Sequence, residues 1–304
     1  MGDINNRNDD IVAIRKALGL EESKCRITHP NSFYVIQPIN RNERLHIAHI
    51  ANFNIFNRYN LSFKNCVFKC EVFLGYKVIN TILNFQRCIF KKYVSFQEGI
   101  VLRRISFNDT IFKNIVYFID SAFKKDVDFS RSRFKERAFF SRARFEQKAI
   151  FSEVIFDHNA HFDGARFQRG VDFSLSEFYQ NAHFYQTIFK NDRHFFEKEE
   201  PNFKQVILNG YINLTHTRIF DFNFEQLKPE IQTSSDAKEF RNIFKNIKNA
   251  LIKDNNLLDA SRLHKMELYA KEIELGYKRE MKAKTSRHWN IFVLLLNNGK
   301  DFID

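Results

Sequence analysis

Large apolar residues recur at a fixed interval through the middle of the chain. One column takes every eleventh position from Phe63 to Phe195, and a second column follows five residues behind it, from Phe68 to Phe189. Phenylalanine fills all but three of these positions. A repeat of this length indicates a structure built from stacked copies of one unit.

The spacing excludes a helix and a flat sheet. On a helix, at about 100° per residue, the two columns lie about 140° apart, so no single apolar stripe forms. In a straight strand alternate side chains point to opposite faces, so a step of five residues exposes half of the phenylalanines. Both conflicts vanish if the chain turns a corner between successive phenylalanines, because every phenylalanine then points inward.

The residue two positions before each large one supports this interpretation. From residue 88 to residue 187 it is small or β-branched, as at Val94, Ser132 and Ala138, and the residues between are mostly polar. Each short side therefore buries one small and one large residue. Such sides stack into a coil that grows in one dimension and pairs its backbone with the coils above and below.

Two adjacent units, Ala160-His161-Phe162-Asp163-Gly164 and Ala165-Arg166-Phe167-Gln168-Arg169, carry the motif of the pentapeptide-repeat family. The chain resembles this family over residues 51–228. The resemblance implies an all-β solenoid, a right-handed quadrilateral β-helix with four sides per coil. A sixth residue in every second side lengthens the repeat, so four sides take about 22 residues. A flattened, two-sided coil of about 11 residues is the competing geometry.

The start of the chain differs from the repeat. Residues 1–50 predict an N-terminal cap region with a short helix over 9–20, for which Asp9 or Asp10 is the expected N-cap. A strand and turn follow over 27–40.

Residues 229–304 predict a C-terminal helical region that caps the β-helix as a hairpin. The apolar positions of its first helix step by four, three and four: Phe240, Phe244, Ile247 and Leu251. The second helix carries an apolar seam with heptad spacing: Leu263, Met266, Ala270, Ile273 and Tyr277. This seam either packs inside the chain or joins two chains as a homodimer, and the sequence leaves both open.

This tail is similar to that of bacterial pentapeptide-repeat proteins in which a helical pair precedes membrane-spanning segments. The apolar run over 291–297 is too short to span a bilayer, which takes about 20 apolar residues. We expect a cytoplasmic protein, placed at the inner membrane if the native chain extends beyond residue 304.

Composition and charge narrow the class of protein. With 36 Phe against 9 Gly and 4 Pro, the chain has neither a disordered nor a collagen-like composition. The formal net charge is +12, and residues 61–228 carry most of the excess, with 26 Lys and Arg against 19 Asp and Glu. A basic balance permits contact with nucleic acid or anionic lipid and also serves solubility.

The densest basic stretch lies in the middle of the repeat, where arginines alternate with acidic residues. On the predicted four-sided coil Arg144 stacks beneath Arg166, with Arg169 close by. An arginine ridge of this kind can bind phosphate or an acidic protein, whereas interleaved carboxylates favour a mixed, solvated surface. The predicted partner contacts are Arg131, Arg133, Arg142, Arg144, Arg166 and Arg169.

The cysteines show no paired zinc spacing, and no secretory signal opens the chain. Cys66 and Cys88 occupy equivalent inward positions one predicted coil apart, so we expect them to stack as small core residues. Reduced thiols are typical of the cytosol, and a disulfide between the two is the less favoured alternative.

Motifs of catalysis are missing from the sequence: it holds no phosphate-binding glycine loop, no dinucleotide-binding motif, no zinc-protease motif and no nucleophile elbow. We therefore expect no enzymatic activity, no cofactor and no metal. His161 stacks over His183, and Asp172 over His194, but neither pair has an evident third ligand. An exposed polar ladder is the favoured interpretation.

Three functions follow from these patterns. The favoured one is a structural and interaction module, a rigid rod that binds a protein partner. The second is modulation of a type II topoisomerase (gyrase) by mimicry of DNA, as in some pentapeptide-repeat proteins, but a mimic of DNA must be acidic. The third is nucleic-acid binding through the arginine ridge, which we do not expect because the phenylalanines point inward and leave no exposed aromatics for base stacking.

Overall fold

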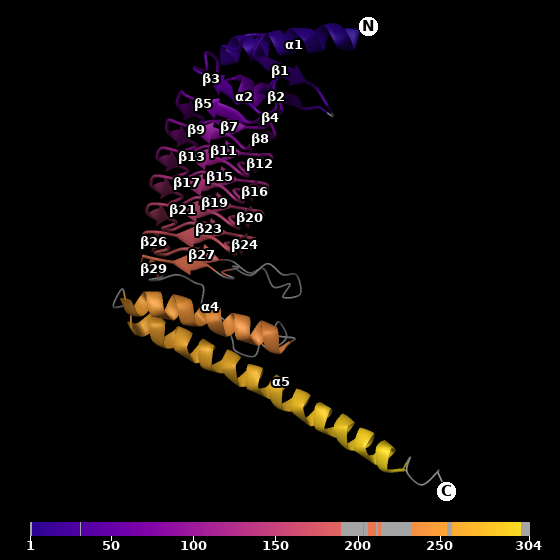
Figure 1. Ribbon diagram of the computed structural model, residues 1–304. Coiled ribbons are helices and arrows are strands. Elements are labelled where there is room, and N and C mark those ends of the chain that lie inside the picture. The colour runs from indigo at the N-terminus through magenta and orange to yellow at the C-terminus, as the bar shows by residue number, and fades with distance from the viewer. Residues whose placement is uncertain are drawn as a thin grey trace. The chain divides into compact units, whose positions relative to one another are not determined.

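The computed structural model describes residues 2–30, 32–189, 203, 206–210, 212–213, 233–253 and 257–298 (Figure 1). The chain divides into two compact units near residue 220. The first unit holds the N-terminal cap and the coils, the second holds the C-terminal helices, and each is described by itself.

Four stacks of short strands form the sides of the coil, named here sides A to D. Side A consists of β1 (Cys25–Thr28), β2 (Tyr34–Pro38), β4 (Leu61–Lys64), β8 (Leu83–Gln86), β12 (Ile105–Ser106), β16 (Val127–Asp128), β20 (Ala149–Ile150) and β24 (Val171–Asp172). Side B consists of β3 (Leu45–Ile47), β5 (Cys66–Phe68), β9 (Ile89–Phe90), β13 (Ile111–Phe112), β17 (Arg133–Phe134), β21 (Ile155–Phe156), β25 (Glu177–Phe178) and β28 (Ile207–Leu208).

The other two stacks complete the circumference. Side C consists of β6 (Val72–Phe73), β10 (Val94–Ser95), β14 (Val116–Tyr117), β18 (Ala138–Phe139), β22 (Ala160–His161), β26 (Ala182–His183) and β29 (Ile212–Asn213). Side D consists of β7 (Val78–Ile79), β11 (Ile100–Val101), β15 (Ala122–Phe123), β19 (Arg144–Phe145), β23 (Arg166–Phe167) and β27 (Ile188–Phe189). The chain visits A, B, C and D in turn, so side B lies opposite side D.

The strand register confirms the longer, four-sided coil. Ile105 of β12 pairs in parallel with Val127 of β16, and Ile111 of β13 pairs with Arg133 of β17. In each pair the chain passes through three other sides before it returns to the same stack. The flattened, two-sided coil is therefore excluded, and the predicted β-helix with a helical region is confirmed.

Stacked phenylalanine rings fill the interior of the coils. Phe107 lies with its centroid 5.1 Å from Phe85 and 5.2 Å from Phe129, with nearly parallel planes. Rings of neighbouring sides meet edge to face, as Phe96 and Phe107 do at 5.9 Å. Both arrangements are favourable for aromatic quadrupoles.

The small inward residues tolerate a polar atom because the corners supply acceptors. The buried hydroxyl of Thr110 donates to the carbonyl of Phe85, and that of Ser176 donates to the carbonyl of Phe173. A buried hydroxyl with a partner carries little desolvation penalty. This accounts for most of the Ser, Thr and Cys residues at these positions; the buried hydroxyl of Ser132 is an exception, with no hydrogen-bond partner in the described part of the chain.

Two kinds of corner explain the alternating five- and six-residue steps. We count a corner as the residues between two successive inward side chains. Corners from A to B and from C to D hold two residues, and the second of these adopts a left-handed conformation, as Asp109 does with φ 56°. Corners from B to C and from D to A hold three residues. The left-handed residue recurs every eleven positions: Asn65, Tyr76, Arg87, Glu98, Asp109, Asp120, Arg131, Arg142, Glu153, Gly164, Leu175 and Gln186.

The N-terminal cap begins with helix α1 (Gly2–Leu18), which starts well before the predicted N-cap. The prediction of Asp9 or Asp10 as the cap is wrong, since both lie inside the helix. Asp10 instead accepts hydrogen bonds from the hydroxyls of Tyr34 and Tyr59, at 2.6 and 2.8 Å. These bonds fix α1 against the first coil.

The remaining cap region already belongs to the coil. The predicted strand and turn are confirmed by the antiparallel pair β1 and β2. In addition, β2 pairs with β4 and β3 pairs with β5, so sides A and B begin before residue 51. The short helix α2 (Ile55–Arg58) stands between β3 and β4.

The second unit is an antiparallel helical hairpin of α4 (Ser234–Lys253) and α5 (Leu257–Asn298). Arg241 pairs with Glu274 and Lys248 pairs with Glu267, each at 2.6 Å. As one partner moves forward along α4, the other moves back along α5, which fixes the direction. The predicted helical region is confirmed, while its role as a cap for the β-helix stays a prediction.

Within the described ranges, no helix combines the length and the apolar character that a membrane crossing requires.

Candidate partner-binding surface

Charge is distributed unevenly around the coil. Outward positions on sides A and C are mainly polar or aromatic, whereas sides B and D carry most of the lysines and arginines. Because each outward position recurs in register every coil, the residues at one position form a column along the solenoid axis, and a column holds either like charges or ion pairs such as Arg104 with Asp126. The predicted arginine contacts can be placed within these columns.

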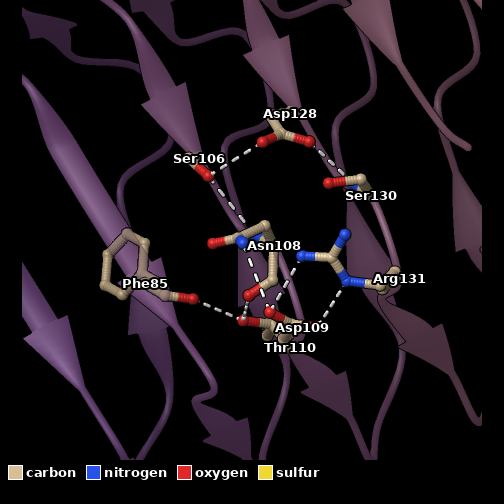
Figure 2. A network of polar contacts seen from close by, with 8 residues as sticks. All are labelled: Phe85, Ser106, Asn108, Asp109, Thr110, Asp128, Ser130 and Arg131. Carbon is tan, nitrogen blue, oxygen red and sulfur yellow. Dashed lines mark hydrogen bonds and ion pairs between the residues drawn. The ribbon is translucent and has the colours of Figure 1, made fainter.

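Arg131 and Arg142 occupy left-handed corners, where each is neutralised by an aspartate one coil earlier. Arg131 binds both carboxylate oxygens of Asp109, at 2.8 and 3.2 Å, as Figure 2 shows. Arg142 binds Asp120 in the same way, at 2.7 and 2.6 Å. Hydrogen bonds from these guanidinium groups lower the pKa of Asp109 and of Asp120.

The same view shows how the corner shields its own polar groups. Asp128 on side A accepts from the backbone N–H of Ser130, at 2.8 Å, and from the hydroxyl of Ser106, at 3.4 Å (Figure 2). The side chains around Arg131 therefore bind one another. Little of this corner is left to bind a partner.

Arg133 is also engaged within the chain. It lies on side B and binds both oxygens of Asp157, at 2.9 and 3.0 Å. Arg131 and Arg133 thus lie on or beside side B, while Arg142 lies beside side D. The six predicted arginines do not form a single ridge.

The other three predicted arginines come together. Arg144 of β19 and Arg166 of β23 are paired in register on side D, and Arg169 follows in the next D-to-A corner. All three are exposed. The stacking of Arg144 beneath Arg166 is therefore confirmed.

Two lysines of the D-to-A corner join these arginines. Lys148 and Lys125 lie one and two coils before Arg169, and both are exposed. We define the D-side basic surface as Lys125, Arg144, Lys148, Arg166 and Arg169. Within the described residues, none of the five has a carboxylate in ion-pair distance.

The acidic residues of side D are already neutralised. Asp126 accepts from Arg104 at 2.7 Å, and Glu146 accepts from Lys124 at 2.5 Å. Like charges on adjacent strands repel each other. An anionic partner that neutralises Arg144 and Arg166 relieves this repulsion, and the relief favours binding.

Sequence reasoning missed Lys125 and Lys148, which flank the dense arginine stretch, because it did not sort the lysines by their place in the coil. Lys125 lies two coil lengths before Arg169, so both residues occupy the same column. Sorting the chain by the register of the four-sided coil would have found Lys125 in this column and Lys148 one position beside it in the coil between.

A row of stacked rings on the outside of side C corrects the prediction that the surface lacks aromatics. Phe139 stacks on Tyr117 at 5.6 Å and on His161 at 4.8 Å, and His161 stacks on His183 at 4.6 Å. All four side chains are half-buried. Their faces cover one another, so only ring edges meet the solvent and a base cannot stack on them.

The stacked histidines are not oriented towards a common ion. Their planes are within 2° of parallel. The lone pairs of ring nitrogens lie in the ring planes, so those of His161 and His183 run side by side and do not converge on one ion. No cluster of three or more His, Cys, Asp or Glu ligands occurs among the residues described, and His194 lies outside them.

Cys66 and Cys88 are buried in adjacent coils, as predicted. Their thiols donate to the carbonyls of Ile36 and Phe63, at 3.6 and 3.5 Å. Both are free thiols. Burial raises the pKa of Cys66, which keeps the thiol protonated and unreactive.

The predicted dimer seam is largely covered within one chain. Leu263, Met266 and Ala270 are buried, while Ile273 and Tyr277 are half-buried. Dimerisation through this seam stays a prediction.

The fold defines a class of protein. A four-sided solenoid that buries one large and one small residue per side is a rigid scaffold with flat outer faces. The family model described as pentapeptide repeats (9 copies) matches residues 107–155 and 151–197. These residues belong to the pentapeptide repeats, and the strand register carries the same repeat back to β4.

The family resemblance is thereby confirmed for the coils. Searches of the curated proteins and of the solved structures found no match to the chain. A pentapeptide-repeat solenoid is in general a non-enzymatic structural and interaction module.

Proposed function

We propose that the chain is a non-enzymatic interaction module that binds an acidic protein partner through the D-side basic surface. The observation that supports this most directly is the pairing of the arginines. Arg131, Arg133 and Arg142 are neutralised within the chain, whereas the cations of the D-side basic surface are exposed without a carboxylate partner in the described residues.

Rigidity of the support favours this function. The five cations project from three consecutive coils whose strands are fixed by backbone hydrogen bonds, such as that from Arg166 N–H to Ala143 carbonyl at 2.8 Å. A preorganised surface loses little backbone entropy on binding. Guanidinium groups suit carboxylates because they bind both oxygens at once.

Charge also ranks the alternatives. A mimic of DNA must be acidic, but residues 61–228 carry 26 Lys and Arg against 19 Asp and Glu. Base stacking finds no open ring face in the aromatic row on side C. An acidic protein is the partner that fits the described surfaces best.

A crosslinking pull-down tests the proposal. The tagged full-length chain would be crosslinked in its own cells and recovered separately from soluble and membrane fractions. The same experiment uses the triple variant Arg144→Gln, Lys148→Gln and Arg166→Gln. We expect the wild type to recover one acidic protein and the variant to lose about four-fifths of it or more. The reason is that charge pairs across an interface control how fast and how specifically the partner is bound.

A matched control removes the same number of charges elsewhere: Arg26→Gln, Arg41→Gln and Lys64→Gln. This variant should recover the partner as the wild type does. Equal loss from both variants would mean that net charge and not the D-side basic surface drives capture. Recovery of a topoisomerase or of nucleoid proteins would favour the DNA-related alternatives.

The fractions also test the location of the chain. We propose a cytoplasmic location, at the inner membrane if the native chain continues beyond residue 304. Recovery of the partner mainly from the membrane fraction supports the inner membrane, and recovery from the soluble fraction supports the cytosol.

A further inference from the structure

A straight column of lysines runs along side B, opposite the D-side basic surface. Each lysine follows an inward phenylalanine, and each lies one coil further along the chain than the previous one: Lys69, Lys91, Lys113 and Lys135. We call these four residues the lysine column. The backbone confirms the register, because Lys91 N–H donates to Phe68 carbonyl and Lys113 N–H to Phe90 carbonyl, at 2.9 and 2.8 Å. All four side chains are exposed.

The upper three lysines have no counter-charge. Among the residues that the structure describes, no carboxylate lies within ion-pair distance of Lys69, Lys91 or Lys113. Lys135 reaches Asp157 only at 3.9 Å, and that carboxylate already binds Arg133. The column differs in this respect from the corner arginines, which are each held by an aspartate.

The spacing concentrates positive charge. Adjacent strands lie about 4.8 Å apart, so the four lysines span about 14 Å in a straight line. Like charges at this separation repel each other. The resulting positive potential extends to His46 at the N-terminal end of side B. Partial burial and the neighbours Lys69 and Lys91 lower the pKa of His46.

The column has defined borders. An apolar row lies beside it on the same strands, formed by Val67, Ile89 and Ile111. Below Lys135 the same positions turn acidic, with Asp157 in the column and Glu177 beside it one coil further on. A ligand that neutralises the lysines is therefore confined to about 14 Å.

We propose that the lysine column binds an extended acidic segment of a partner protein, with carboxylates at alternate residues. In an extended chain alternate side chains share one face and lie about 6.7 Å apart, so three of them span about 13 Å. This length matches the lysine column. The residues between the acidic ones point away from side B.

Nucleic acid fits the column less well. A phosphate backbone that continued along side B would meet Asp157 and Glu177 in the next coils. The aromatic residues near the lysine column are Tyr93, whose ring contacts Tyr117, and Tyr179, which lies two coils beyond Lys135 among the acidic positions. A short peptide segment ends before the acidic coils.

This site is independent of the D-side basic surface. Side B and side D lie on opposite sides of the coil, so both can be occupied at once. A chain with both sites occupied holds two acidic segments apart across the width of the solenoid.

Fluorescence anisotropy on the full-length chain tests the lysine column. The probe is a labelled heptapeptide with Glu at positions two, four and six and Thr at the other positions. The test variant is Lys91→Gln with Lys113→Gln, and the matched control is Arg26→Gln with Arg41→Gln, two exposed arginines outside both basic surfaces. We expect the test variant to bind the probe at least tenfold more weakly than the wild type, and the control to remain within about twofold.

The opposite results would overturn the proposal. They are no binding of the heptapeptide to the wild type at low salt, equal binding by the wild type and the test variant, or equal weakening in both variants. A labelled twelve-residue oligothymidylate is the second arm. If it binds more tightly than the peptide and depends on Lys91 and Lys113, the site is a nucleic-acid site and the peptide assignment is wrong.

The pull-down under "Proposed function" gives a separate result. Loss of the partner from the D-side triple variant bears only on that surface. Loss of heptapeptide binding from the Lys91 and Lys113 variant bears only on the lysine column.

Discussion

At the scale of single residues, the corners of the coil hold backbone strain at a regular interval. The left-handed corner residues have φ between 53° and 66°, and all except Gly164 carry a side chain. A residue with a Cβ costs about 1–2 kcal/mol in this conformation. The coil retains it because the corner N–H donates to the next coil, as Asp109 N–H does to Ser130 carbonyl at 3.0 Å.

Replacing one strained corner residue by glycine should stabilise the chain. Leu175 has φ 58° and is half exposed, so Leu175→Gly removes strain and loses little buried area. We expect a gain of about 0.5–1 kcal/mol after the higher entropy of unfolded glycine is subtracted. Chemical denaturation measures this. Leu175→Ala keeps the Cβ, so an equal gain from alanine would contradict the strain argument.

The corner ion pairs should make the free energy of unfolding depend on pH in the acidic range. Arg131 lowers the pKa of Asp109 in the folded chain, so the pair stabilises the fold above the unfolded pKa of about 3.8. This stability is lost as the pH falls through the lowered folded pKa. Asp109→Asn should cost about 0.5–1 kcal/mol near pH 7, because the pair is bidentate but partly exposed.

Denaturation of wild type and Asp109→Asn between pH 2 and pH 7 checks this dependence. The two curves should converge at the acid end, where Asp109 is protonated. A constant difference across the range would show that Asp109 acts through packing and not through its charge.

Backbone conformation marks the limit of prediction from sequence at this scale. The length of the four-sided coil places Arg144 beneath Arg166 without any structure, and the same spacing places Asp109 beneath Arg131. It does not reveal the left-handed conformation of the corners, which only glycine or asparagine would signal. The sequence holds residues such as Arg, Asp and Leu at these corners, so the turns that bring the two side chains into bidentate contact were not predictable.

At the scale of elements, α1 is joined to the coils by one carboxylate and two phenols. Burial and the hydrogen bond to Asp10 raise the pKa of Tyr34 and of Tyr59. A raised pKa favours the neutral phenol in the folded chain. The stability that these two phenols contribute is thus complete below the unfolded pKa of about 10, and it is lost as the pH rises towards the folded pKa.

Asp10→Ala should therefore release α1 without unfolding the coils. We expect faster amide exchange along α1, by about tenfold, because two hydrogen bonds to a charged acceptor are lost. Hydrogen exchange at neutral pH measures this. Asp9→Ala is the matched control, since the side chain of Asp9 is exposed, and protection of α1 that is equal in both variants would contradict the role of Asp10.

The hairpin of α4 and α5 is joined by a buried carboxylate. Glu274 is almost fully buried, and Lys278 and Arg241 lower its pKa. Arg241 and Lys278 are partly exposed, so water still hydrates their charges when Glu274 is replaced, and we expect Glu274→Gln to destabilise the hairpin by about 1–2 kcal/mol through the lost hydrogen bonds.

Amide exchange of α4 and α5 in the full chain measures this loss. Glu272→Gln provides the control, because that side chain is exposed on the same helix. If Glu274→Gln leaves exchange in both helices unchanged, apolar packing alone holds the hairpin.

At the scale of the whole coil stack, the phenylalanine columns predict the solenoid but not its circumference. Two-sided and four-sided coils both stack phenylalanine on phenylalanine. The strand pairing decides, since Ile105 lies opposite Val127 and not opposite Val116. The start of α1 was not predictable, because its first turns are polar and carry no apolar period.

The interior of the solenoid repeats after every second side, but its exterior repeats only after a full coil. Deleting residues 92–102, which form two sides, would leave every remaining phenylalanine pointing inward in a column of large apolar residues, yet everything after the deletion would rotate by half a turn. Lys113 and Lys135 would then lie on side D, while Lys69 and Lys91 stayed on side B. A change of chain length by half a turn thus redistributes the charged faces without repacking the core, whereas a change by a whole turn only lengthens them.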